Sequence, residues 1–204
     1  RIQNLISEQL TANGFNEILN NSLTKSSYYT ELNVFPAENC VKIMNPLGVD
    51  LSVLRQTLLF GGLESIARNR NYKNNNLKFY EFGNCYHFHN EKRSSENALS
   101  SFSEDLHLGL WICGNKTAQS WVQKEEKSTV FELKAHVENI LIRIGINQNN
   151  IVVEKLTNDI YSDALQINTK RGEELVVFGC VNKNILNGFD IDAEVFFADL
   201  NWTN

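Results

Sequence analysis

The sequence NPLGVDLSVLRQTLLFGGL at residues 45–63, with FYEFGNCY at residues 79–86, decides the fold. Pro46 fixes its own φ and pushes Asn45 toward an extended conformation, so the pair predicts a turn. Beyond the turn, apolar residues recur at helical spacing: Leu59, Leu63, Ile66 and Ala67. Three cations follow at the end of that helix, where the helix dipole favours positive charge: Arg68, Arg70 and Lys73.

The longest strand is expected at Leu77–His89. Its even positions form an aromatic face: Tyr80, Phe82, Tyr86 and Phe88. Because side chains alternate along a strand, the opposite face carries Glu81, Gly83, Cys85 and His87. This pattern predicts helices on the aromatic side of a sheet and a more polar surface or cleft on the other side.

The remaining elements predict an α+β fold, an antiparallel sheet with helices packed on it. An amphipathic helix is expected from Ile2 to Gly14, and a second from Thr129 to Gly145, where Thr129 and Glu132 have capping-box spacing. Residues 164–168 and 175–181 predict a hairpin. The polar, Ser-rich segment 90–105 is expected to be a mobile hairpin loop.

Composition bounds the class of protein. With 204 residues, 42% hydrophobic and 21% charged, the chain is expected to form one globular module over residues 1–204. A net charge of −5 argues against broad phosphate binding, and the four separated cysteines suggest neither a zinc site nor a disulfide framework. No apolar run reaches the ~20 residues that span a bilayer, so no membrane contact is expected. Because the chain begins at Arg1 and has its single Met at position 44, we expect it to be part of a longer polypeptide.

Several polar residues are candidate site residues. His87 and His89 share one strand face, but no third metal ligand follows at a convincing spacing. Glu81 lies about 20 Å along the strand from His87, too far for an acid/base pair, and a structural hydrogen-bonding role at the sheet edge is the better interpretation. Arg55 is suited to hold either a carboxylate or a phosphate.

The basic trio, Arg68, Arg70 and Lys73, has two interpretations. Interleaved asparagines and Tyr72 make it a candidate RNA contact. A solvated helix end is the commoner outcome for such a cluster.

These motifs resemble the catalytic-like module of bacterial phenylalanyl-tRNA synthetase beta subunits. In that family an Asn-Pro-Leu turn leads through Ser-x-Leu-Arg into a Leu-Leu-x-Gly-Leu helix and then into a strand with Glu-x-Gly. The matching positions are Asn45, Pro46, Leu54, Arg55, Glu81 and Gly83. The resemblance extends over nearly the whole chain.

The resemblance implies the class II aminoacyl-tRNA synthetase fold without its active site. Of the two ATP-binding arginines of that class, the first slot falls near His87, and the second motif is missing. No catalytic, cofactor or metal residue is therefore expected in this fragment, whereas the holoenzyme is expected to use ATP and magnesium.

The resemblance also implies partners and a location. A catalytic alpha subunit would assemble with the beta subunit as a heterotetramer of two alpha and two beta, with tRNA(Phe) bound by the holoenzyme in the cytoplasm. The opening helix is the expected subunit contact, through Ile2, Leu5, Ile6 and Leu10.

Two departures and two alternatives accompany this interpretation. Phe60 stands where the family usually has Pro, and residues 160–164 replace a His-Pro-Gly-Arg-Ser/Ala run, which puts any function of that loop in doubt. The alternatives are a stand-alone ATP-dependent ligase on the same fold, which lacks its arginines here, and an independent RNA-binding module, which the acidic charge disfavours.

Overall fold

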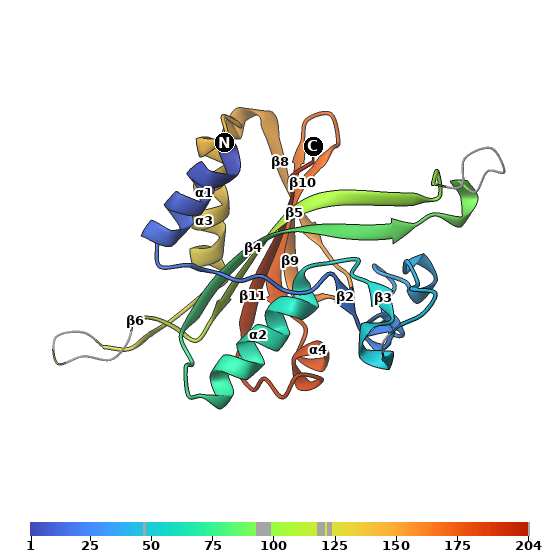
Figure 1. Cartoon of the computed structure of the whole chain (residues 1–204). Coiled ribbons are helices and arrows are strands. Elements are labelled where there is room, and N and C mark those ends of the chain that lie inside the picture. Colours follow the sequence, from blue (N-terminus) through green and yellow to red (C-terminus); the bar gives the residue numbers. More distant parts are fainter. Residues whose placement is uncertain (47, 93–98, 118–120, 122–123, 204) are drawn as a thin grey trace.

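A seven-stranded sheet forms the centre of the molecule, in the order β1-β4-β5-β11-β10-β9-β8 (Figure 1). The computed structural model describes residues 1–46, 48–92, 99–117, 121 and 124–203. The sheet strands are β1 (Asn16–Glu17), β4 (Leu77–Phe88), β5 (Phe102–Cys113), β8 (Ile151–Leu156), β9 (Tyr161–Thr169), β10 (Glu174–Val181) and β11 (Val195–Asn201). Every neighbouring pair is antiparallel except β1 and β4, which run parallel, so the predicted antiparallel sheet is in fact mixed.

The helices and smaller elements surround this sheet. The α-helices are α1 (Ile2–Ala12), α2 (Leu59–Asn71), α3 (Val130–Arg143) and α4 (Lys183–Asn187). Two short ladders join β2 (Leu23–Thr24) to β3 (Val53–Leu54), and β6 (Asn115–Thr117) to β7 (Glu126–Lys127). Short 3₁₀ turns occur at Ser26–Tyr29, Ala37–Asn39, Val49–Leu51, Asn90–Lys92 and Gln148–Asn150. Within the described residues, no helix combines the length and apolar character needed to cross a membrane.

Both faces of the sheet are covered by helices. On the face of Tyr80, α1 and α3 pack through one apolar cluster that includes Ile6 and Leu133. On the opposite face, α2 and α4 share a second cluster with Trp111 and Phe197 (Figure 1). The prediction of helices on the aromatic side of β4 is therefore confirmed, but the other face is polar only where α2 and α4 do not reach.

The hairpin between β4 and β5 is longer than predicted. Segment 90–105 was expected to be a loop, yet β5 already begins at Phe102, and its polar residues pair with β4 as far as Phe88 opposite Phe102. Backbone hydrogen bonds join the two strands of this hairpin, and such bonds do not depend on side-chain polarity. Residues 93–98 lie outside the described residues, and the predicted mobility of the segment stays a prediction.

The two long predicted helices are confirmed, with one correction at a helix start. Gly14 (φ +83°) and Gly145 (φ +92°) take the left-handed conformation that ends α1 and α3. At the start of α3, however, Thr129 makes no side-chain capping bond, so the predicted capping box is not formed. Glu132 instead holds Lys78 of β4 at 2.7 Å, an ion pair that ties α3 to the sheet.

Candidate functional site

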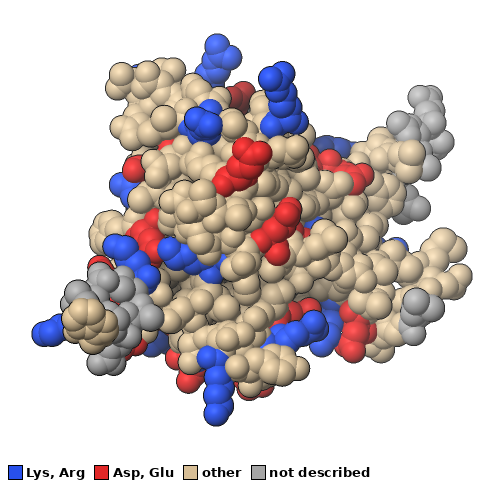
Figure 2. Space-filling view, turned by 60° about the vertical axis from the view of Figure 1, so that its left-hand side comes forward, with Lys and Arg blue, Asp and Glu red and all other residues tan. Residues whose placement is uncertain are grey.

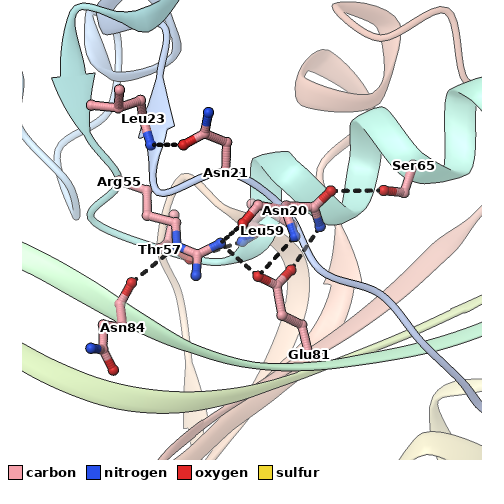
Figure 3. A network of polar contacts seen from close by, with 9 residues as sticks. All are labelled: Asn20, Asn21, Leu23, Arg55, Thr57, Leu59, Ser65, Glu81 and Asn84. Carbon is pink, nitrogen blue, oxygen red and sulfur yellow. Dashed lines mark hydrogen bonds and ion pairs between the residues drawn. The ribbon is translucent and has the colours of Figure 1, made fainter.

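The family-type motifs meet in a buried ion pair between α2 and the sheet. Arg55 lies just before α2, and Glu81 lies on β4 facing that helix. Nη1 of Arg55 is 2.7 Å from Oε1 of Glu81, and the two side chains are 7% and 0% exposed (Figure 3). Arg55 was expected to bind either a carboxylate or a phosphate, and in the structure it binds a carboxylate of its own chain.

A wider hydrogen-bond network surrounds the pair. The amide Nδ2 of Asn20 donates to Oε2 of Glu81 at 2.7 Å, and its backbone N–H donates to Oε1 at 3.3 Å. Arg55 Nε donates to the carbonyl of Asn84 at 3.0 Å, and Ser65 of α2 donates to Asn20 Oδ1 at 3.0 Å (Figure 3). Because both charged groups have partners, the network joins the segment after α1, the start of α2 and β4 into one unit.

Gly83 explains the Glu-x-Gly spacing. Side chains two residues apart lie on the same face of a strand, so position 83 sits beside Glu81 under the guanidinium. A Cβ at Gly83 would lie 2.2 Å from Nη2 of Arg55. The motif thus supplies a carboxylate and, two residues on, the space that its partner needs.

The other motif positions have simpler roles. Leu54 pairs with Leu23 in the β2–β3 ladder, and the next residue, Arg55, accepts a backbone hydrogen bond from Tyr86 of β4 at 2.9 Å. Asn45 lies in a bend, as the predicted turn requires, and both Asn45 and Pro46 are exposed, whereas Leu47 lies outside the described residues. Phe60, where the family usually has Pro, is buried and stacks on Tyr28 with ring centroids 4.8 Å apart.

The histidine pair at the end of β4 has no third metal ligand beside it among the described residues. The rings of His87 and His89 are 6.3 Å apart, and the described residues contain no group of three or more His, Cys, Asp or Glu side chains placed to hold a metal ion. His89 instead contacts Ser103 Oγ at 3.0 Å. Burial, together with the charge of His107, lowers the pKa of His87, so this side chain is a poor substitute for a permanently charged arginine.

Sequence reasoning missed a group of polar residues near His87. His107 of β5 donates through Nδ1 to Oδ1 of Asp199 on β11 at 2.6 Å. Burial lowers the pKa of His107, but the charge and hydrogen bond of Asp199, with the charges of Asp105 and Glu174, raise it overall above 6.5. The two partners lie 92 positions apart, so no local spacing in the sequence relates them. The only signal in the sequence is one Asp within the otherwise apolar run VFFADL.

The basic trio does not form one patch. Arg70 pairs with Asp192 near α4 and borders a different hollow from the one that Arg68 and Lys73 share. On the face turned forward in Figure 2, Lys and Arg are interspersed with Asp and Glu and form no large field of one sign. An RNA contact at Arg68 and Lys73 therefore remains a prediction, and Arg70 is already occupied.

The opening helix uses most of its apolar side chains within the molecule. Ile6 and Leu10 are 0% and 1% exposed and belong to the core cluster. Contrary to the prediction, these two side chains are therefore not available to contact another subunit. Leu5 is partly buried. Ile2 is 59% exposed, and it borders an apolar hollow of about 310 Å³ with Leu141 and Ile144.

Comparisons with known proteins agree with the motifs. The family model described as the phenylalanyl tRNA synthetase beta chain CLM domain matches residues 1–202. The phenylalanine–tRNA ligase beta subunit of Bacteroides fragilis is 55% identical over 202 residues, covering 99% of this chain and 25% of that protein. The same subunit of Porphyromonas gingivalis is 46% identical, covering 98% of this chain and 24% of that protein. The chain thus spans about a quarter of the length of the curated relatives it matches.

A solved structure supports the fold assignment. The pyrrolysyl tRNA synthetase PylSc of Desulfitobacterium hafniense superposes with a TM-score of 0.68 at 14% identity, covering 98% of this chain and 64% of that one. At this identity the likeness concerns the fold alone. Together with the sheet order and the flanking helices, it places the chain in the class II aminoacyl-tRNA synthetase fold.

Proposed function

The chain belongs to the phenylalanyl-tRNA synthetase beta chain family, and from that membership we propose that residues 1–204 form a single non-catalytic module of a longer beta subunit. In this proposal the module supports the ATP-dependent attachment of phenylalanine to tRNA(Phe) by a partner alpha subunit. The observation that carries the proposal is the 55% identity to a phenylalanine–tRNA ligase beta subunit over 99% of the chain. The holoenzyme would use ATP and magnesium in the cytoplasm, with this module binding neither.

The polar groups of the sheet support a non-catalytic role. Phosphate oxygens are best held by arginines that bind bidentately. Arg55 is already engaged by Glu81, and His87 stands near the slot that the family resemblance gives to an ATP-binding arginine. The nearby cavity is lined by Asp105, Glu174 and Asp199, whose negative charge would repel a triphosphate.

A surface at the α1–α3 end supports contact with the alpha subunit. Ile2 of α1 and Ile142 of α3 are 59% and 56% exposed. Next to Ile2 lies the apolar hollow bordered by Leu141, Ile144 and Trp202. Exposed apolar side chains beside a hollow suit the core of an obligate interface, so we propose this end of α1 and α3 as the subunit contact of a two-alpha, two-beta heterotetramer.

Contact with tRNA(Phe) is proposed only locally. Arg68 and Lys73 border one hollow with several asparagines, and these side chains offer both charge and hydrogen bonds to a phosphate. With a net charge of −5, such a contact would position RNA and not carry most of its affinity.

Reconstitution of the enzyme tests the proposal. The full-length beta subunit that carries this chain is purified alone and together with the alpha subunit of the same organism. Phenylalanine-dependent exchange of pyrophosphate into ATP, and charging of tRNA(Phe), are expected only when alpha is present, with tyrosine in place of phenylalanine as the control. Exchange by the beta subunit alone would contradict the non-catalytic role.

A further inference from the structure

A cavity of about 520 Å³ opens on the same sheet face as α2 and α4, over the part of it that these helices do not cover. Its floor consists of side chains from β4, β5, β10 and β11, and its walls come from the segment at Phe35 and from the turn between β8 and β9. The volume lies within the roughly 300–1,000 Å³ of small-molecule sites. The ion pair of Arg55 and Glu81 is not part of this lining.

The cavity carries an excess of negative charge. Three carboxylates line it, from Asp105, Glu174 and Asp199, and no Lys or Arg occurs among its described lining residues. His107 offsets one of these charges through its bond to Asp199. The carboxylates of Glu174 and Asp199 repel each other, and this repulsion, after burial, raises the pKa of Glu174. A further cation in the cavity would relieve the repulsion.

One buried polar group among the lining residues lacks a partner. Gln56 is 2% exposed, and its Oε1 accepts no hydrogen bond from the described residues although its Nε2 donates to the carbonyl of Pro36. Tyr161, which is 6% exposed, also lines the cavity. A buried polar group without a partner is costly, so a ligand that supplies donors would be favoured.

The walls provide aromatic surface. The rings of Tyr161 and Phe197 stack with centroids 6.3 Å apart, and Phe35 stacks on His87 at 6.5 Å. Aromatic faces accommodate an apolar group and also attract a cation.

We propose that this cavity binds a small organic cation, an ammonium or guanidinium group carried on a short apolar or aromatic body. The N–H donors of the cation would meet the carboxylates and Gln56 Oε1, and its body would lie against Tyr161 and Phe197. The proposal is independent of the synthetase function, because it rests only on the lining of the cavity.

Binding of three matched probes to the full-length subunit tests the proposal. Phenethylamine, phenethyl alcohol and phenylacetate share a benzyl body and differ in charge, and their dissociation constants are measured by isothermal titration calorimetry. We expect the amine to bind at least about tenfold more tightly than the alcohol, because a unit charge a few Å away in a partly buried site contributes more than one power of ten. Phenylacetate should not bind detectably.

Two variants locate the site. Glu174→Gln removes one lining charge at a residue that also remains exposed, and it should raise the dissociation constant of phenethylamine by about tenfold. Glu173→Gln, at the adjacent exposed position outside the cavity, is the matched control and should bind as wild type. The proposal is overturned if the amine binds no more tightly than the alcohol, or if Glu174→Gln and Glu173→Gln bind it equally.

Discussion

The guanidinium of Arg55 lies directly over Gly83, so closely that a Cβ at position 83 would be 2.2 Å from Nη2. The buried carboxylate of Glu81 holds the guanidinium in that position at 2.7 Å. The ion pair and the glycine therefore form one structural unit, because the guanidinium of Arg55 occupies the space that a side chain at position 83 would need.

Replacing this glycine should destabilise the fold. We expect Gly83→Ala to lower the free energy of unfolding by about 3 kcal/mol, because the added methyl group must displace the guanidinium from its buried partner. Gly48→Ala is the control: that position is exposed, has extended φ, and a Cβ there meets no atom within 4 Å. Urea denaturation of both variants measures the difference, and equal stabilities would contradict the close approach.

Breaking the ion pair should cost more than breaking an exposed one. Glu81→Gln leaves the cation of Arg55 buried and unpaired, and we expect a loss of about 3–5 kcal/mol in the free energy of unfolding. The control is Asp163→Asn, which removes the pair with Lys155 (3.3 Å, both side chains 74% exposed) and should cost less than about 1 kcal/mol. If chemical denaturation gives similar losses for the two variants, the buried pair is not structural.

Periodicity in the sequence was sufficient for the elements that bury one face. The apolar spacing of Leu133, Val137 and Ile140 identified α3, and all three are 0% exposed. The alternation along β4 likewise identified its two faces. In both cases the signal is local, because the burial of one face dictates the residue types along the element.

Features that depend on distant partners were not predictable in this way. Segment 102–105 is polar, yet it pairs with β4 through backbone hydrogen bonds that leave no mark on composition. Glu132 has the spacing of a capping box, but Lys78 of β4 competes for its carboxylate. His107 and Asp199 meet only because β5 and β11 are neighbours in the sheet, so the candidate cavity appears only once the topology is known.

The pair of His107 and Asp199 should make stability depend on pH. The pKa of His107 is raised in the folded state, so its contribution is full below the ordinary value of 6.5 and is lost as pH rises through the higher folded pKa. The difference in unfolding free energy between wild type and His107→Asn should therefore shrink as pH rises above 6.5. His136, whose pKa is lowered by burial and by Lys78, is the control, because His136→Asn should become relatively more stable than wild type as pH falls below 6.5. Denaturation at a series of pH values measures both, and a pH-independent difference for His107→Asn would refute the assignment.

The exposed end of α1 and α3 should decide whether the subunits stay together. Leu10 was expected at this contact, but Leu10→Glu would place a charge in the core and unfold the chain, so Ile2→Glu and Ile142→Glu are the informative changes. Each should weaken co-purification with the alpha subunit by about thirtyfold or more, because a charge at the centre of an apolar interface commonly costs ~2 kcal/mol. Met44→Glu is the matched control, since Met44 is 94% exposed shortly after the Lys42 bridge and is not among the residues that border the apolar hollow. Size-exclusion chromatography of the co-expressed full-length subunits measures the retained alpha subunit. If all three variants retain it equally, the contact lies on another surface of the module.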